Sequence, residues 1–313
     1  MTAIAVIGEA VADAFLPAAG EGGFGLRVTP GGSPANTAVA LARLGTSARF
    51  LGRLSTGPLG RLLRAHLEES GVDLSAAVRT ERKATLAVTA LDDQGRADYD
   101  FYVEGTADWH WTPAELARLA DSPVDAVHTG SLALALPPGA EEIRAALAAA
   151  RPGATICVDP NARPGIVPAA AYREQLPHWL PLADIVKVSD EDLAYIHPGE
   201  ALAGVCDRWH GMGVRLIVIT QGGKGAMASL DGERAGVPAV PVTMVDTVGA
   251  GDAFSAGLLH TLGRLGRLGG RLPALTTGEL REALAFAALV AARTCATTGA
   301  NPPWARELTA QVG

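Results

Sequence analysis

Cysteine is scarce in this sequence of 313 residues, and its three copies, at positions 157, 206 and 295, show no paired spacing. An odd number of widely separated cysteines excludes a disulfide framework and a zinc cluster, and it indicates a reducing compartment. A secretory signal is not expected either, because Glu9 and Asp13 interrupt the N-terminal segment and no basic region precedes it. The longest purely apolar run, Ala283 to Ala292, is about half the roughly 20 residues that a membrane span needs. We therefore expect a cytoplasmic protein without a membrane-spanning segment.

Positive charge is also in short supply. The chain has 26 Lys and Arg against 33 Asp and Glu, which gives a net charge of −7 with histidine neutral. Nucleic-acid binding calls for a concentrated positive face, so this balance argues against such a partner. A hydrophobic fraction of 48% with 19% charged residues excludes a mostly disordered chain. We expect residues 1–313 to form a single domain with a sizeable core.

Short apolar runs alternate with longer amphipathic segments along most of the chain. This alternation is typical of an α/β fold in which helices cover both faces of a mostly parallel sheet, that is, a three-layer αβα sandwich. The expected strands are Ile4–Ile7, Ala48–Leu51, Ala126–Thr129, Thr155–Val158, Ile185–Val188 and Leu216–Thr220. The expected helices are Ala35–Leu44, Leu59–Ser70, Pro113–Leu119, Glu141–Ala150, Leu193–Ile196, Ala201–Met212 and Ala253–Leu262.

Two stretches, approximately residues 11–30 and 84–108, break this rhythm. The first is rich in glycine, and the second alternates like a hairpin around Asp92-Asp93-Gln94-Gly95. We expect them to add antiparallel strands to the parallel core as a small β lid. One apolar face of this lid must then be covered by substrate, core or a second subunit.

The most informative segment reads DTVGAGDAFSAG, from Asp246 to Gly257. Its glycines allow a tight turn into an apolar helix, and the free N–H groups of such a helix start favour an anion, for example a phosphate undergoing transfer. Asp252 then lies in the first turn, where a carboxylate can accept a proton from a substrate hydroxyl. The alternative is that Asp252 only caps the helix. Neither a dinucleotide-binding GxGxxG nor a GxxxxGK[ST] phosphate loop fits the glycine spacing.

A second glycine-rich element, Gly31-Gly32-Ser33-Pro34-Ala35-Asn36, leads into another helix. Paired glycines let the backbone approach a polar ligand closely, and Asn36 offers both a donor and an acceptor. Together with Asp13, which follows the first strand, Asn36 is a candidate for binding sugar hydroxyls. Capping of loops is the alternative role for both side chains.

These segments resemble the pfkB/ribokinase family of carbohydrate kinases, in its fructokinase-like branch. GGSPANTAVALARLG and DTVGAGDAFSAG carry the resemblance, and four further motifs match in order along residues 4 to 305. They are DPNARP at Asp159–Pro164, KVSDED at Lys187–Asp192, TQGGKG at Thr220–Gly225 and GANPP at Gly299–Pro303.

The resemblance implies an ATP-dependent kinase that phosphorylates a sugar hydroxymethyl group. Asp252 would be the general base, and the backbone of Gly249, Ala250 and Gly251 would form the anion hole. The sugar would lie under the lid against Asp13, Gly31, Gly32, Asn36, Phe101 and Arg163. ATP, with Mg²⁺ on its phosphates, would lie across Lys187, Ser189, Asp192, Thr220, Gly222 and Gly225.

Five positions depart from the family pattern or add to it. Ser189 and Asp192 stand for the Asn and Glu of the family's N-x-x-E element, which shifts how magnesium and its waters are held. Val103 replaces an arginine that is expected to pair with the carboxylate of sugar-acid substrates, so we expect a neutral sugar, with fructose as the first candidate. Asp246 and Val248 resemble positions that feed a monovalent-cation loop, which suggests K⁺.

Other functions with the same motifs stay open from the sequence. Within enzymes these are a 2-keto-3-deoxygluconate kinase and a nucleoside kinase, and outside catalysis a sugar-binding regulator with an inactive kinase site. The intact GAGD sequence that ends at Asp252 favours catalysis. The resemblance also suggests a homodimer formed through the lids.

Overall fold

The central feature is an eight-stranded sheet in a computed structural model that describes residues 2–16, 25–91 and 97–309. Six parallel strands form its main part, in the order β12-β11-β10-β9-β1-β4, and all six coincide with predicted strands. Two antiparallel strands, β13 and β14, extend one edge. The bounds are β1 Ala3–Ile7, β4 Ser47–Leu51, β9 Ala126–Gly130, β10 Thr155–Asp159, β11 Ile185–Ser189, β12 Leu216–Thr220, β13 Ala226–Leu230 and β14 Glu233–Val237.

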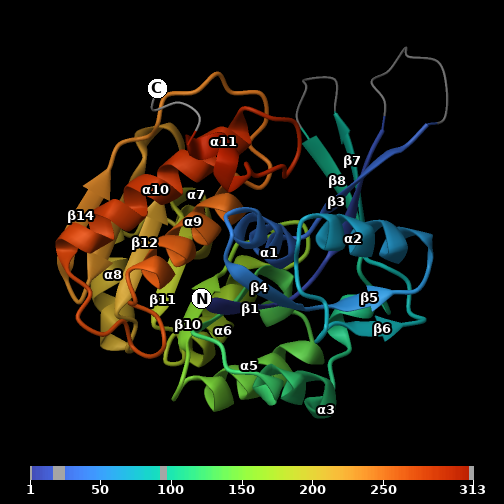
Figure 1. Cartoon of the computed structure of the whole chain (residues 1–313), viewed down its shortest axis with the longest axis horizontal. Helices are drawn as coiled ribbons and strands as arrows, with labels where there is room; N and C mark the ends of the chain where they lie inside the picture. Colours follow the sequence, from blue (N-terminus) through green and yellow to red (C-terminus); the bar gives the residue numbers. More distant parts are fainter. Residues whose placement is uncertain (1, 17–24, 92–96, 310–313) are drawn as a thin grey trace.

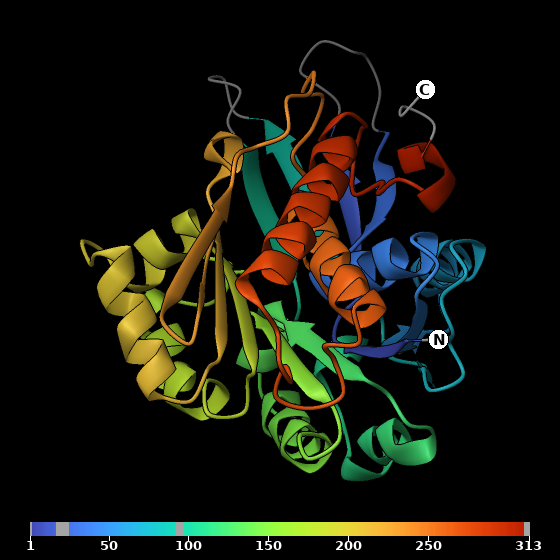
Figure 2. The ribbon, with the colours of Figure 1, turned by 60° about the vertical axis from the view of Figure 1, so that its left-hand side comes forward.

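Helices cover both faces of this sheet, so the chain has the expected three layers (Figures 1 and 2). Successive residues of one strand pack into different cores: Ile4 and Val6 join one cluster, and Ala5 and Ile7 the other. Burial on both faces explains why the strands read as continuous apolar runs. The first core includes α1 (Ser33–Arg43), α2 (Pro58–Glu69), α9 (Ala250–Arg264) and α10 (Thr277–Cys295). The second includes α5 (Gly139–Ala150), α6 (Ala169–Trp179), α7 (Asp190–Ile196) and α8 (Leu202–Gly211).

A separate four-stranded sheet projects beside α2 and forms the lid (Figure 1). Its order is β3-β2-β7-β8, with bounds β2 Val11–Phe15, β3 Arg27–Gly31, β7 Leu86–Leu91 and β8 Ala97–Tyr102. Each predicted stretch is indeed an antiparallel pair, but the expectation of antiparallel strands throughout was wrong, because β2 pairs with β7 in parallel. The two pairs come from distant parts of the chain, and no turn dictates how they join. The predicted turn at Asp92–Gly95 lies outside the described residues.

The remaining elements are short. Strands β5 (Arg53–Ser55) and β6 (Val78–Thr80) form a two-stranded sheet, and the short helices are α3 (Pro113–Leu116), α4 (Ser131–Ala135) and α11 (Ala305–Thr309). The expected helix Pro113–Leu119 is α-helical only to Leu116 and continues as a 3-10 helix over Ala117–Asp121. Over the described ranges, no helix has the length and apolar character to cross a membrane.

Candidate active site

The turn before α9 brings free backbone donors to the carboxyl-terminal edge of the large sheet. Gly249 is the N-cap of α9 and has a left-handed conformation, with φ of 77°. A Cβ at this position would lie 2.6 Å from Cβ of Ala300, so both conformation and space require glycine. The N–H of Ala250 donates to the carbonyl of Thr247 at 3.2 Å, whereas that of Gly251 has no acceptor within the described residues. This helix start therefore provides a place for an anion.

The side chain of Asp252 lies beside this turn and is nearly completely buried. Its Oδ1 accepts a hydrogen bond of 2.6 Å from the Ser33 hydroxyl, and its Oδ2 accepts one of 2.8 Å from Nδ2 of Asn36. Asn161 Nδ2 lies 3.5 Å from Oδ1. These bonds come from α1 and from the loop after β10. None of the described bonds joins this carboxylate to its own helix, so the geometry does not support the role of a simple helix cap.

Several predicted sugar-binding residues gather on the lid side of Asp252. Burial raises the pKa of Asp13 to about 6, opposed by Arg163 and reinforced by Asp252, which places these three charges near one another. A side chain at Gly31 would collide with the Asp13 carboxylate, and one at Gly32 would come within 2.8 Å of the Glu9 carbonyl. The strand that carries Asp13 can thus approach the start of α1 closely only because both positions are glycine.

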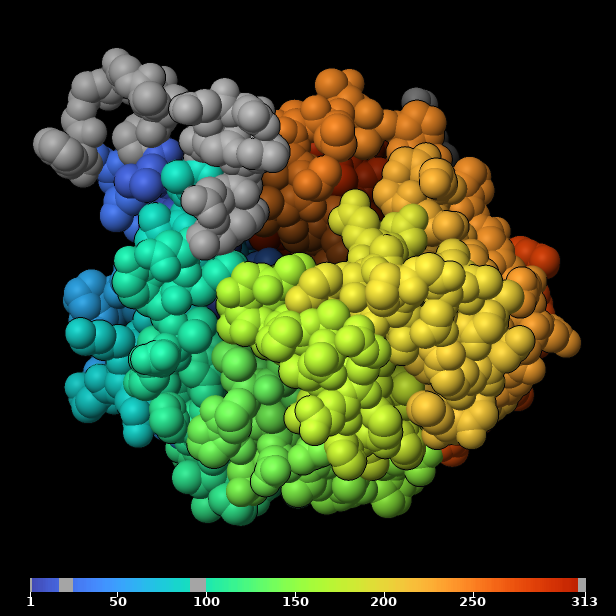
Figure 3. All heavy atoms as spheres, turned by 180° about the vertical axis from the view of Figure 1, so that it is seen from behind, coloured from blue at the N-terminus to red at the C-terminus, as the bar shows by residue number. Residues whose placement is uncertain are grey.

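The loop after β10 contributes Asn161 and Arg163 to the same cluster of residues around Asp252 and Asp13. Nη1 of Arg163 donates to Oδ1 of Asn161 at 2.5 Å, and the backbone N–H of Arg163 donates to the hydroxyl of Tyr172 at 2.9 Å. The ring of Phe101, from lid strand β8, lies against this loop, because a Cβ on Gly165 would be 3.6 Å from that ring. Figure 3 shows a hollow in the surface between the lid and the C-terminal half of the chain.

Two carboxylates, Glu9 and Asp108, are buried, and sequence reasoning missed both. Oε2 of Glu9 accepts the N–H of Ala133 in α4 at 3.2 Å. Oδ2 of Asp108 accepts the hydroxyl of Thr85 at 2.6 Å, and its Oδ1 accepts the N–H of Ala10 at 3.1 Å. Burial raises the pKa of Glu9 to about 7 and that of Asp108 to about 6. Asp108 thereby ties Ala10, which precedes lid strand β2, to Thr85, which precedes lid strand β7. Asp108 lies in the lid sequence GTAD, which was the available signal.

The predicted nucleotide residues lie on two neighbouring parallel strands or directly after them. Lys187 on β11 is buried, and its Nζ lies 2.8 Å from Oδ2 of Asp159. Ser189 and Asp192 form a capping box at the start of α7, and Oδ1 of Asp192 also accepts the N–H of Ala162 at 2.9 Å. The register of β11 and β12 places Thr220 directly beside Ser189.

Gly222 and Gly225 belong to the turn that follows β12. Both have positive φ, 52° and 99°, and Gln221 N–H donates to the carbonyl of Gly225 at 2.8 Å. A side chain at Gly225 would collide with the Val237 carbonyl. This turn lies at the same sheet edge as Asp252, and no described hydrogen bond joins the two.

The predicted monovalent-cation segment is folded against the end of α10. Backbone N–H groups of Val245 and Asp246 donate to the carbonyl of Cys295 at 2.8 and 3.2 Å. The Asp246 carboxylate accepts the N–H groups of Gly299 and Val248 at 2.8 and 3.1 Å. The residues expected to form a cation loop are therefore together, although both carboxylate oxygens of Asp246 already accept backbone bonds.

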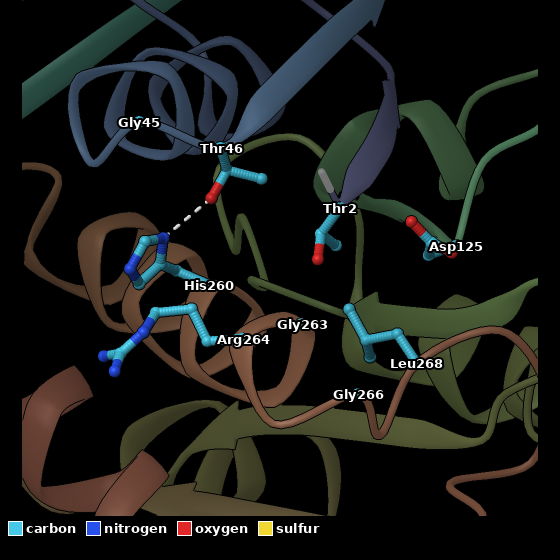
Figure 4. A pocket seen from close by; sticks show the side chains of 9 residues that line it. All are labelled: Thr2, Gly45, Thr46, Asp125, His260, Gly263, Arg264, Gly266 and Leu268. Atoms are coloured by element: carbon cyan, nitrogen blue, oxygen red, sulfur yellow. Dashed lines mark hydrogen bonds between the residues drawn. The ribbon is translucent and has the colours of Figure 1, made fainter.

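A pocket of about 490 Å³ lies away from all these residues (Figure 4). It opens at the start of β1 and the last turns of α9, where Oγ1 of Thr46 lies 2.7 Å from Nδ1 of His260. A helix of 15 residues is about 20 Å long, so this pocket is far from Asp252 at the other end of α9. It contains none of the predicted site residues.

Comparison with known proteins identifies the class of enzyme. Residues 1–306 match the model of the pfkB family of carbohydrate kinases, and the chain belongs to that family. A fructokinase from Klebsiella pneumoniae is 38% identical over 294 residues, which cover 90% of this chain and 92% of that protein. The chain is thus an ATP-dependent sugar kinase with the ribokinase-like fold and lies in the fructokinase-like branch.

Solved structures of two relatives cover nearly the whole chain. The crystal structure of the Xylella fastidiosa fructokinase with bound ATP has a TM-score of 0.88 and 28% identity, over 98% of this chain and 97% of that one. A double mutant of the Vibrio cholerae O395 fructokinase, in a fructose, ADP and potassium ion bound form, has a TM-score of 0.81 and 26% identity. The shares covered are 96% and 94%.

Proposed function

We propose that this chain transfers the γ-phosphoryl group of ATP to a hydroxymethyl group of fructose. The observation that carries the proposal is the Asp252 carboxylate, buried and held by Ser33 and Asn36 beside the free N–H of Gly251. A base next to an anion hole is the arrangement that phosphoryl transfer to an alcohol needs. The sugar hydroxyl gives its proton to Asp252 while its oxygen forms the new bond to phosphorus, and the bond from phosphorus to ADP breaks. The likeness to two fructokinases of known structure supports fructose and ATP as the substrates.

Magnesium fits this site as an ion bound to the ATP phosphates. No group of three or more acidic, His or Cys side chains suited to a metal occurs within the described residues. Asp192 already accepts two backbone N–H groups, and we infer that it holds the ion through water. Bound magnesium would neutralise charge on the transferring phosphate.

A neutral ketose fits the lid better than a sugar acid. Val103, at the position where a cation would meet a carboxylate, packs against the core on its apolar side. Kinetics with fructose, 2-keto-3-deoxygluconate and a nucleoside, followed through ADP release, test this choice. We expect kcat/KM for fructose to exceed the others by about 100-fold, the discrimination typical of a specific site. A preference for either competitor would replace fructose in the proposal.

The variant Asp252→Asn tests catalysis itself. It keeps the shape of the side chain and removes the base, so turnover should fall by about 100-fold or more while ATP binding stays close to wild type. Turnover near the wild-type rate would contradict the role of Asp252. Sugar binding by the wild-type protein without any ATP consumption would instead support a non-catalytic regulator.

Three further proposals accompany this function. We infer a K⁺ site at the loop of Asp246 and Val248, because this segment and Gly299 are held together and a related structure contains potassium. Equal rates in sodium and potassium salts would refute it. We also infer a homodimer through the lid, whose outer face exposes apolar side chains, and a cytoplasmic location, in keeping with ATP as substrate and three free thiols.

A further inference from the structure

A buried ion pair lies directly behind the turn that starts α9. Nζ of Lys187 is 2.8 Å from Oδ2 of Asp159, and the two side chains are only 4% and 1% exposed. A Cβ on Gly251 would lie 2.9 Å from the same Nζ, so the ammonium group packs against the Gly251 backbone. Lys187 is thus buried beside Gly251, next to the predicted anion hole.

Lys187 keeps its positive charge in this position. Burial alone would lower its pKa, but Asp159, through its charge and hydrogen bond, together with Asp192 and Asp252, raises that pKa above its ordinary value. Of the two charged groups, the Asp159 carboxylate is the one closer to neutralisation at neutral pH, because burial raises its pKa to about 6. A positive charge therefore stays next to Gly251 throughout the neutral pH range.

The pair is poorly explained as a device for stability. Replacing a buried ion pair by apolar residues is often neutral or stabilising, because desolvation of two charges offsets their attraction. Here the arrangement is also incomplete, since Oδ1 of Asp159 is buried and has no partner within the described structure. What the pair does provide is orientation. Asp159 holds the ammonium group of Lys187 where its field adds to that of the free N–H of Gly251.

We propose that Lys187 is a positioning residue that acts through the Gly251 backbone, strengthening the anion hole for the phosphoryl group in transfer, and that Asp159 holds it there. The inference rests on the proposed kinase function and deepens it. Negative charge gathers on the phosphoryl oxygens in the transition state, so a fixed cation behind their donors lowers the barrier more than it strengthens ATP binding. The effect should therefore appear in kcat and much less in the KM for ATP.

The test compares Lys187→Met with the double variant Lys187→Met/Asp159→Asn. The single variant leaves a buried carboxylate without its partner and should lower the melting temperature, whereas the double variant removes both charges and should restore it. Removing one anion-hole donor typically costs about 100-fold or more in kcat. We expect a loss of that order in both variants, with the KM for ATP within about threefold of wild type. Lys83→Met, the same substitution at an exposed lysine outside the site, is the matched control and should leave all three quantities unchanged.

A double variant that regains both stability and kcat would overturn the proposal, because the pair would then be only structural. Binding gives a second readout: with fructose present, the double variant should lose affinity for ADP with aluminium fluoride, which imitates the phosphoryl group in transfer, and keep its affinity for ADP alone. Equal losses for the two ligands would also overturn the proposal. If the wild-type protein itself bound the mimic no better than ADP, the proposed kinase function would fail instead, so the two failures are distinguishable.

Discussion

At the scale of single residues, the hydroxyl of Ser33 is the part of the site whose contribution is simplest to isolate. Its bond of 2.6 Å orients one oxygen of Asp252, and removing a hydrogen bond to a charged group costs about 1.5–3 kcal/mol. We therefore expect Ser33→Ala to lower kcat by about 10- to 100-fold, with little change in the KM for ATP, as measured by steady-state kinetics. Ser255→Ala is the matched control, because this serine of α9 is buried and its hydroxyl has no partner in the described structure. Equal effects of the two variants would show that the Ser33 bond has no special role.

Asp13 combines its proposed sugar-binding role with a cost in stability. Its folded-state pKa of about 6 exceeds the ordinary value of 3.8, because burial disfavours the charged form. The neutral form is favoured on folding, so this group contributes stability below about pH 4 that is lost as the pH rises through 6. Asp13→Asn should accordingly be more stable than wild type at pH 7 by about 2–3 kcal/mol, and this difference should vanish near pH 4.

The pH dependence of sugar binding by Asp13 should be opposite to that of its contribution to stability. A carboxylate accepts sugar hydroxyls better than a carboxylic acid does, so the KM for fructose in the wild-type enzyme should rise as the pH falls below 6. In Asp13→Asn this KM should be high at every pH. Denaturant unfolding and kinetics between pH 4 and 8 measure both quantities. A variant that is less stable at pH 7, or that keeps the pH dependence of KM, would contradict the assignment.

A site residue could be predicted from the sequence when the residues it acts with are its neighbours in the chain. The Gly249–Asp252 turn was predictable, because glycines followed by an acid at a helix start imply an anion site within a few residues. Ser33 and Asp159 were not assigned roles, although both lie in the motifs that suggested the family. Their partners, Asp252 and Lys187, lie 219 and 28 residues away, and nothing in the local sequence specifies those contacts.

At the scale of secondary structure, the packing of α9 against α10 fixes where the active-site turn lies. Gly257 sits at this contact, and a Cβ there would lie 2.8 Å from Cα of Ala287 and 3.2 Å from Cγ2 of Val290. Gly257→Ala should therefore push the helices apart and destabilise the protein by about 1–3 kcal/mol, the usual cost of overpacking. Turnover should fall too, because Asp252 moves with α9.

Gly204→Ala in α8 is the matched control for this change. A Cβ at Gly204 meets no atom within 4 Å, so the helix gains the roughly 1 kcal/mol by which alanine is favoured over glycine. Thermal unfolding of the two variants should give melting temperatures on opposite sides of wild type, and only Gly257→Ala should reduce kcat. A stabilising Gly257→Ala would mean that the helix contact is looser than described.

Several features that sequence reasoning missed share one property, namely that long-range packing stabilises them. Helix α6 contains Pro177 in its last turn, which weakens any local helix pattern. Strands β13 and β14 form an antiparallel edge that the pattern of a parallel sheet does not suggest. The parallel pairing of β2 with β7 likewise depends on how two distant hairpins meet.

At the scale of the whole molecule, the net charge of −7 bears on how the enzyme meets ATP. A negative protein does not attract a polyanion from a distance, so binding must rest on local features. The described site has such features in the helix start at Gly251 and in the cation of Lys187 behind it. The same net charge disfavours other polyanions, such as nucleic acids, as partners.

The lid is the surface through which we propose that two copies of the chain associate. Leu16, Leu26 and Tyr102 are 49%, 51% and 54% exposed, and strand pairing places Leu26 and Tyr102 on the lid face opposite Asp13. Exposed apolar side chains gathered on one face of a sheet mark an interaction site, and a second copy of the same lid is self-complementary by symmetry.

We expect the protein to sediment as a dimer and Leu26→Glu to shift it to the monomer, because the variant would bury two unpaired carboxylates in the interface between the lids. Val242→Glu, at another exposed apolar residue outside the lid, should leave the dimer intact. Both variants should fold, since the side chains they replace are already solvent-exposed. A wild-type protein that sediments as a monomer would contradict the dimer and would assign the apolar face of the lid to another partner.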